Sequence, residues 1–373
     1  MDKDLIPGRV ALQQRVLPAY RAPFFDSLAV ACEGGLSVFA GDPLPQENIN
    51  TSVDLRDARY YVARNHHFMS PSSPLYRCRQ DGILEWLEEW CPQVLIVEAN
   101  PRNTSTPGAV QWMHKRGHPV IGWGLGAPPV AGLLGFWRNR VRNHFLHSLD
   151  GVIAYSRRGE QQYRSLGIPS ERVFTAVNAV SPRPTHPMPD RPVDFDGKSK
   201  LLFVGRLQFR KRIDNLLMAC AALPYSLQPG LWIIGDGPAR DEFMSIAEKV
   251  FPSAEFLGAL NGAALDDYFT RADIFVLPGT GGLAVQQAMA FGLPVIVAEG
   301  DGTQDDLVSS DNGWLVPAGD VRALTGALKE ALSNTALLRR MGEASYRLVS
   351  EEINLQAMVD VFVRALSTIK VKK

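Results

Sequence analysis

The chain has 373 residues, of which 46% are hydrophobic and 21% charged, and its 39 lysines and arginines balance 39 aspartates and glutamates. This length is typical of two domains that each bury a core, and the apolar content excludes an intrinsically disordered chain. A net charge of zero argues against nucleic acid as a partner, because domains that bind phosphate backbones are usually strongly basic.

Neither a targeting segment nor a membrane-spanning segment is expected. Residues 1–9 lack an apolar stretch of signal-peptide length, and the longest apolar run, 130–137, is far shorter than the ~18 residues of a spanning helix. The cysteines form no Cys-x-x-Cys pair, which favours free buried thiols over disulfides or a zinc site. We therefore expect a cytoplasmic protein, with a peripheral position at the inner face of the plasma membrane left open.

Short apolar or β-branched runs alternate with amphipathic segments of helix length along most of the chain. The expected strands are 9–12, 36–40, 94–98, 119–123, 151–155, 200–204, 231–235, 254–257, 273–277 and 294–298. The expected helices include 83–90, 215–222, 265–271 and 283–291. This alternation predicts an α/β fold with parallel sheets and crossover helices.

One Pro-rich segment, 181–197, interrupts this alternation and has no periodicity. Its composition is typical of a stiff linker. The alternation resumes after it, so we expect an N-terminal Rossmann-like domain over 1–180 and a second over 198–352.

Two turns that follow expected strands carry candidate site residues, because parallel sheets bind ligands at the carboxyl ends of their strands. After Gly205 come four cations within seven residues: Arg206, Arg210, Lys211 and Arg212. They form either a solvated basic loop or an anion site in which Arg206 and Lys211 supply the charge.

The second turn, 279–282, is rich in glycine and leads into an expected helix. Free amides at a helix N-terminus bind phosphate, although glycines also serve ordinary tight turns. The spacing matches neither the P-loop nor the dinucleotide fingerprint. A third turn with Gly235 and Asp236 is interpreted as structural.

The motifs over about 150–335 resemble, in order, those of family 4 glycosyltransferases. They are 204–207 with Lys211, 234–238, 256–260, 272–278, 282–283, 287–296 and 312–320. Residues 177–180 resemble the interdomain segment of that family, and 17–25 resemble its N-terminal half more loosely.

The resemblance implies the GT-B fold, with two doubly wound Rossmann-like domains facing across a deep cleft and residues 353–373 forming a helix that packs back on the N-terminal domain. It also implies retaining, metal-independent transfer of a sugar from a UDP- or GDP-sugar to a hydroxyl acceptor. The acceptor is expected to be a growing cell-surface glycan or a lipid-linked sugar, bound by the N-terminal domain, while 198–352 bind the nucleotide sugar.

The resemblance also assigns site residues. Arg206 and Lys211 are the expected catalytic residues, which hold the diphosphate and neutralise the charge that develops on the leaving group. The other expected donor-binding residues are Gly205, Leu260, Thr280, Gly281, Gly282, Leu283 and Gln287. The expected acceptor-binding residues are Tyr20, Arg21, Asn100, Arg102 and Trp123.

The sequence departs from the family pattern at three places. The family usually has a Glu, seven residues and a second Glu, where this chain has Gly279 and Gln287. Many members also have a His after the strand matching 119–123, where this chain has Trp123-Gly124-Leu125-Gly126. These changes keep a non-catalytic binding or partner protein and a nucleotide-sugar epimerase of the same fold as alternatives. Retention of Arg206, Lys211 and the Gly-rich turn argues against the first of them.

No metal site is expected, because His66, His67, His114 and His118 have no carboxylates at metal-ligand spacing. Residues 133–146 combine apolar and aromatic residues with Arg138, Arg140 and Arg142 and contain no acid. This pattern fits either a core-packed helix with a solvated cationic face or a helix that contacts an anionic membrane.

Overall fold

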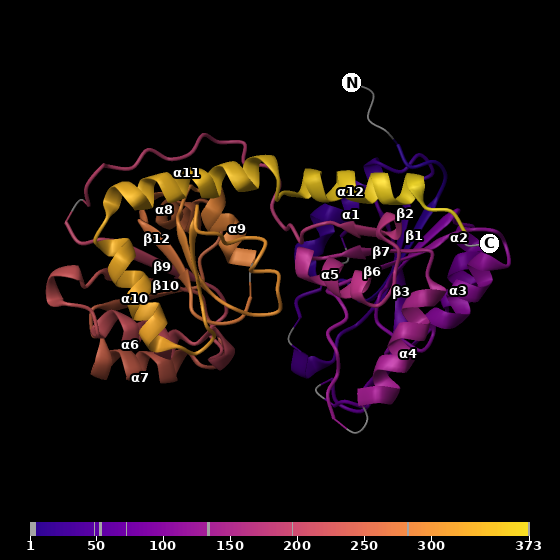
Figure 1. The fold of residues 1–373 in the computed structure, drawn as a ribbon, viewed down its shortest axis with the longest axis horizontal. Helices are drawn as coiled ribbons and strands as arrows, with labels where there is room; N and C mark the ends of the chain where they lie inside the picture. The colour runs from indigo at the N-terminus through magenta and orange to yellow at the C-terminus, as the bar shows by residue number, and fades with distance from the viewer. Residues whose placement is uncertain are drawn as a thin grey trace. The chain divides into compact units, whose positions relative to one another are not determined.

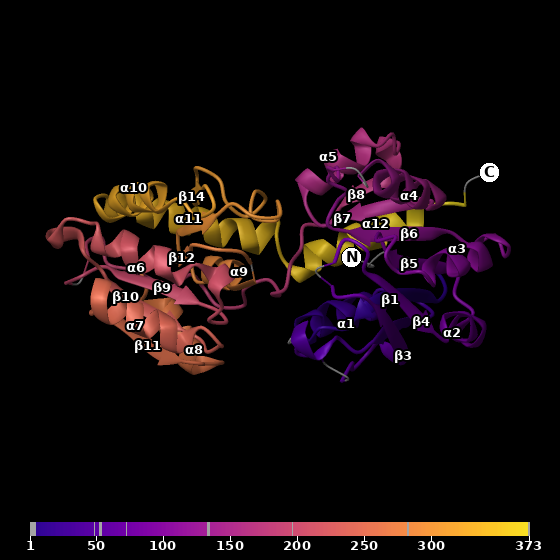
Figure 2. The ribbon, with the colours of Figure 1, turned by 90° about the horizontal axis from the view of Figure 1, so that it is seen from below.

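The computed structural model describes residues 5–47, 49–51, 54–71, 73–132, 135–195, 197–281 and 283–371. The chain divides into two compact units, of which unit 1 comprises Met1–Val180 with Leu355–Lys373 and unit 2 comprises Ser181–Asn354. Each unit has a largely parallel sheet flanked by helices (Figure 1, Figure 2), which confirms the predicted fold class of two Rossmann-like units.

The sheet of unit 1 has the strand order β4-β3-β2-β1-β5-β6-β7-β8, and all its neighbours are parallel except β3 and β4. Its elements are β1 Val10–Val16, α1 Ala22–Val30, β2 Leu36–Gly41, β3 Arg59–Phe68, β4 Arg77–Asp81, α2 Ile83–Trp90, β5 Val94–Glu98, α3 Thr106–His114, β6 Val120–Gly124, α4 Gly135–Ser148, β7 Gly151–Ala154, α5 Arg157–Ser165, β8 Val173–Thr175 and α12 Leu355–Thr368. The order reverses between β1 and β5, so the loops that follow these two strands flank the switch point where such sheets bind ligands.

Helix α12 belongs to unit 1 although it lies at the other end of the chain, and it packs on α1, β7 and β8. Its Phe362 is fully buried, with ring centroids 5.0 Å from Phe24 and 5.1 Å from Trp123. The aromatic packing fixes α12 beneath the end of β6, which carries one of the expected site residues.

Unit 2 has the strand order β11-β10-β9-β12-β13-β14, and all neighbours are parallel. Its elements are β9 Lys200–Val204, α6 Ile213–Ala221, β10 Gly230–Ile234, α7 Arg240–Val250, β11 Ala254–Gly258, α8 Ala263–Arg271, β12 Ile274–Leu277, α9 Leu283–Ala290, β13 Val295–Ala298, β14 Gly313–Val316, α10 Val321–Leu332 and α11 Thr335–Glu351. Here the switch point lies between β9 and β12, which are the two strands that precede the basic loop and the Gly-rich turn.

The described residues of the Pro-rich segment lie along unit 2 (Figure 1). Arg191 donates to the carbonyl oxygens of Phe269, Ala272 and Gly292 at 2.9, 2.9 and 3.3 Å. Burial lowers the pKa of Arg191 to about 10. These bonds hold the segment against the body of unit 2.

Several expectations need correction. The strands β3, β4, β8 and β14 were not expected; β3 carries mostly polar residues that are only partly buried, so it lacks the apolar run of a buried strand. Cys91 is exposed, whereas the other three cysteines are buried as expected. His66 and His114 do meet carboxylates, since they pair with Asp81 at 2.7 Å and with Asp150 at 2.8 Å.

Within the described ranges, none of the helices combines the length and the apolar character needed to cross a bilayer.

Candidate functional site

The basic loop and the Gly-rich turn of unit 2 lie at the carboxyl ends of two neighbouring strands. Strand β9 is buried along most of its length and ends at Val204, so the chain leaves the sheet at Gly205. Strand β12 ends at Leu277, and the turn leads into α9. Because β9 and β12 pair directly, the two segments meet at the switch point of the sheet.

Three hydrogen bonds join these two segments. The backbone N–H of Thr280 donates to the Arg210 carbonyl oxygen at 3.0 Å, and the Nζ of Lys211 donates to the Thr280 carbonyl oxygen at 2.7 Å. Arg210 donates from Nη1 to the Thr280 hydroxyl at 3.2 Å. The structure thus brings Lys211, Thr280 and Gly281 together, as the sequence predicts.

The ammonium group of Lys211 is partly removed from solvent in this arrangement. Burial, with a smaller effect of the neighbouring Arg210 charge, lowers the pKa of Lys211 to about 8. Lys211 is therefore mainly a cation at neutral pH, and its half-buried position favours contact with an anion.

The four cations of the basic loop divide into different roles. Arg212 lies in the left-handed region at φ 53° at the start of α6 and binds Asp214 at 3.0 Å and Asn215 at 2.8 Å, so it organises the helix start. Arg206 is exposed at the sheet end. Arg206 and Lys211 therefore stay the better candidates for a ligand.

Gly279 occupies a place where a side chain has no room. A Cβ atom there would lie 2.2 Å from the Arg210 carbonyl oxygen and 2.5 Å from the Lys211 carbonyl carbon. The backbone of the basic loop thus fills the position of the first motif Glu, which the sequence alone does not show.

The turn at Gly235 and Asp236 packs against the start of the basic loop at Gly205. Gly235 has φ 139°, and a Cβ there would lie 2.0 Å from the Gly205 carbonyl oxygen. The Asp236 carbonyl accepts from the Leu207 N–H at 2.9 Å. These contacts agree with the structural interpretation of this turn.

The remaining expected donor residues lie at the same edge of the sheet. Leu283 is exposed at the start of α9, and Gln287 is half-buried one turn further on. Leu260 is half-buried in the loop after β11. Gly282 lies outside the described residues. Sequence reasoning missed Gln304, which is buried and donates to the Gly281 carbonyl oxygen at 3.0 Å; no motif signals it.

Unit 1 contains a cavity of about 710 Å³ at the carboxyl ends of β5 and β6. Asn100, Arg102 and Trp123, which the sequence predicts to bind an acceptor, line it. Tyr20 and Arg21 do not line this cavity.

Arg21 instead belongs to an aromatic cluster beside the cavity. It is 4% exposed, and its guanidinium carbon lies 4.5 Å from the Trp123 ring centroid, 5.2 Å from that of Tyr155 and 5.5 Å from that of Tyr20. Such cation–π contacts hold the wall of the cavity in place.

Glu98 is the acidic residue of the cavity wall. Its carboxylate accepts the backbone N–H of Arg15 at 2.9 Å, and burial raises its pKa. Arg15 also forms two 2.8 Å hydrogen bonds with Glu47. Arg15 and Arg77 are wall residues that sequence reasoning missed, because β4 was not expected and Arg15 lies within a longer β1 than predicted.

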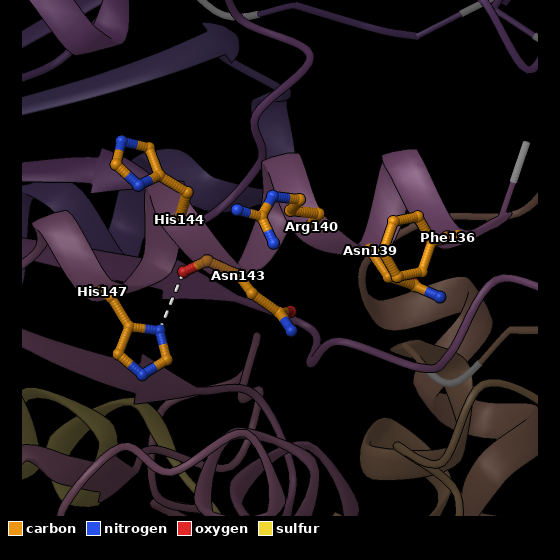
Figure 3. Close-up of a pocket in the computed structure, with 6 residues that line it drawn as sticks. All are labelled: Phe136, Asn139, Arg140, Asn143, His144 and His147. Carbon is orange, nitrogen blue, oxygen red and sulfur yellow. Dashed lines mark hydrogen bonds between the residues drawn. The ribbon is translucent and has the colours of Figure 1, made fainter.

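Helix α4 corresponds to most of the segment 133–146, of which residues 133 and 134 lie outside the described ranges. Phe145 and Leu146 are buried in the core, whereas Phe136 and Trp137 are 68% and 65% exposed. Figure 3 shows the outward face of the helix, where Phe136, Asn139, Arg140, Asn143, His144 and His147 line a shallow pocket. Core packing therefore accounts for the apolar residues at the C-terminal end of this helix but not for the exposed aromatic residues at its N-terminal end.

Two Rossmann-like units, each with polar or charged groups at its switch point, define a two-unit doubly wound α/β protein. Residues 189–348 match the family model described as glycosyl transferases group 1.

Similar proteins agree with this assignment. A GDP-mannose-dependent alpha-mannosyltransferase of Mycolicibacterium smegmatis is 38% identical over 158 residues, which cover 41% of this chain and 39% of that protein. The lipopolysaccharide core biosynthesis glycosyltransferase LpsE of Rhizobium meliloti is 25% identical over 45% of this chain and 49% of its own length. The matches thus span half or less of these relatives.

The solved structure of HepE from Anabaena in complex with UDP resembles the whole fold. Its TM-score is 0.69 at 15% identity, and the alignment covers 97% of this chain and 100% of that one. The fold that the resemblance implies is therefore confirmed, and the family match over residues 189–348 agrees with the motifs.

Proposed function

We propose that this protein transfers a sugar from a nucleotide-diphosphate sugar to a hydroxyl group of a glycan or lipid-linked acceptor. The observation that carries the proposal is the contact of the Lys211 ammonium with the Thr280 carbonyl, beside the start of α9. It places a cation next to helix amides at the switch point of the unit that matches the family model.

In this proposal, residues 198–352 bind the donor. Arg206 and Lys211 contact the diphosphate and neutralise the charge that develops as the glycosidic bond to it breaks. The backbone of Gly205, Thr280, Gly281, Gly282 and Leu283 completes the phosphate site. Leu260 presents backbone to the base, and Gln287 binds the ribose hydroxyls with its amide.

Residues 1–180 bind the acceptor through the unit 1 cavity. Asn100, Arg102 and Trp123 contact the acceptor directly. Arg21 holds the Trp123 wall in position, and Tyr20 is exposed beside it. This assignment gives each unit one of the two substrates.

The proposal includes retention of the anomeric configuration and independence of metal ions, as the resemblance implies. Two fixed cations supply the charge that a divalent ion supplies in other sugar transferases. The test is a panel of UDP- and GDP-sugars assayed for nucleotide release, with EDTA and with Mg²⁺ in parallel. One donor is expected to turn over equally in both series, and dependence on Mg²⁺ would contradict the metal-independent part.

A non-catalytic binding protein is distinguished by the same panel, since it would bind nucleotide without releasing sugar from any donor. An epimerase would convert the donor into an isomeric nucleotide sugar, or release that isomer, rather than transfer the sugar to an acceptor. The packing at Gly279 favours the transferase. The basic loop leaves no room for a side chain at this position, so the absence of the family Glu does not require that the site has been lost.

Donor binding is expected to weaken as the pH rises above about 8. The pKa of Lys211 is lowered to about 8, so the ammonium is charged below this pH and neutral above it. Calorimetric titration of UDP and GDP between pH 7 and 9.5 is expected to show a loss of affinity approaching tenfold per pH unit.

Lys211→Arg is the control for this effect, because a guanidinium keeps its charge over the whole range. A steep pH dependence that persists in Lys211→Arg would show that another group is responsible.

We also propose that α4 contacts anionic membrane lipid. Phe136 and Trp137 are exposed beside Arg138 and Arg140, as in helices that lie at lipid interfaces. At low salt the protein is expected to co-sediment with phosphatidylglycerol vesicles and not with phosphatidylcholine vesicles.

Phe136→Ser is expected to lower this co-sedimentation severalfold, because it removes an exposed aromatic ring. Tyr225→Ser is the matched control, since Tyr225 is 82% exposed, more than Phe136, but lies in unit 2. Absence of vesicle binding at low salt would rule the contact out.

A further inference from the structure

Three arginines from three separate segments line the unit 1 cavity. Arg77 begins β4, Arg102 lies in the loop after β5, and Arg138 lies on α4. They are called the arginine triad below. All three are half-buried, so the fold brings their charges into a partly desolvated space.

The charges in this cavity are not balanced. Its described wall contains Arg15 and Arg142 besides the triad, and Glu98 as its acid. Arg15 is neutralised by Glu47, and Arg142 is bound by the Asn139 side chain at 2.9 Å. Within the part of the chain that the structure describes, no salt bridge includes a member of the triad.

The triad members also repel one another. The pKa of Arg102 is lowered by burial and, after that, by the charges of Arg138 and Arg77. Clustered cations without a counter-charge raise the energy of the free protein, and a bound anion relieves that repulsion.

Apolar side chains border the triad. Leu75, Trp137 and Val141 line the same cavity and are more than half exposed. Exposed apolar groups beside a cation cluster fit a ligand in which an anionic group adjoins an apolar one.

We propose that the arginine triad binds a phosphate or diphosphate group of the acceptor, with the apolar border contacting whatever is esterified to it. Planar guanidinium groups match phosphate oxygens in paired hydrogen bonds, and three of them match more than one negative charge. The proposal rests on the proposed function, because it treats this cavity as the acceptor site. A lipid-linked phosphate and a soluble sugar phosphate share this chemistry.

The test is calorimetry at low ionic strength with three probes: glucose 1-phosphate, octyl phosphate and uncharged octyl glucoside. The wild-type protein is expected to bind both phosphates at least about tenfold more tightly than octyl glucoside. Octyl phosphate binding more tightly than glucose 1-phosphate identifies a lipid-linked source, and equal affinities identify a soluble one.

The double variant Arg102→Gln with Arg138→Gln is expected to lose about tenfold or more of the phosphate affinity. The control is Arg64→Gln, which removes an exposed charge from β3 outside the cavity and is expected to leave the affinity unchanged. Unchanged affinity in the double variant, equal losses in both variants, or no phosphate binding by the wild type would overturn the proposal.

Binding of UDP and GDP distinguishes failure of this inference from failure of the proposed function. The double variant is expected to bind nucleotide as the wild type does, and Lys211→Ala is expected to bind octyl phosphate normally. If the protein binds the phosphate probes but neither nucleotide, the proposed function is wrong while the anion site is still supported.

Discussion

Lys211→Ala is expected to lower kcat by about 10²–10³, because it removes a charged donor from the leaving diphosphate. The lysine reaches this position through the basic loop, which is bonded to the Gly-rich turn at Thr280. A charge held at a fixed, half-buried site stabilises a developing anion more than a mobile surface charge does. Steady-state assays with the active donor measure the effect.

The fold is expected to survive this substitution, because the strands and the backbone bond from Thr280 to Arg210 do not depend on the lysine side chain. Unfolding in urea is therefore expected to be close to that of the wild type. Lys249→Ala, an exposed lysine on α7, is the matched control and is expected to keep full activity. Unchanged turnover in Lys211→Ala would refute the role of Lys211.

Gly279→Ala is expected to destabilise the protein by about 1–3 kcal/mol and to abolish most of the activity. A Cβ at this position would lie 2.2 Å from the Arg210 carbonyl oxygen, and the backbone cannot give way as a side-chain tip does. Relief of the clash is expected to move the basic loop away from the Gly-rich turn, which separates Lys211 from the proposed phosphate site. Urea unfolding and turnover are measured on the same preparation.

Gly326→Ala is the control, because no atom lies within 4 Å of a Cβ there and the residue is inside helix α10. It is expected to be stabilising by about 0.5–1 kcal/mol. Gly279→Glu, which restores the family residue, is expected to be worse than Gly279→Ala. A stable and more active Gly279→Glu protein would contradict this account of the basic loop.

The apolar runs made most strands of the fold predictable from the sequence, and the turns after them carry most of the candidate site residues. The residues 200–204 are an apolar run followed by Gly205, and this pattern located β9 with its correct ends. An apolar run, here without a following glycine, also located β5 correctly. Because ligands bind at such strand ends, the predicted residues Lys211, Thr280, Asn100 and Arg102 fall at the two candidate sites.

Other features depend on tertiary contacts that leave no local pattern. Strand β3 pairs with β2 and β4 while its residues stay largely polar, so its periodicity is weak. Arg77 reaches the cavity only because that antiparallel pair forms. Gly279 resembles a lost catalytic residue in the sequence, and only the position of the basic loop shows that the glycine is sterically required.

The central claim is that the basic loop and the Gly-rich turn of unit 2 bind a nucleotide diphosphate. Calorimetric titration of the wild type and of Lys211→Ala with UDP and GDP at pH 7 tests it most directly. We expect one nucleotide to bind the wild type with one site per chain and to bind Lys211→Ala at least about tenfold more weakly. Failure of both nucleotides to bind the wild type, or equal affinities for the two proteins, would contradict the claim.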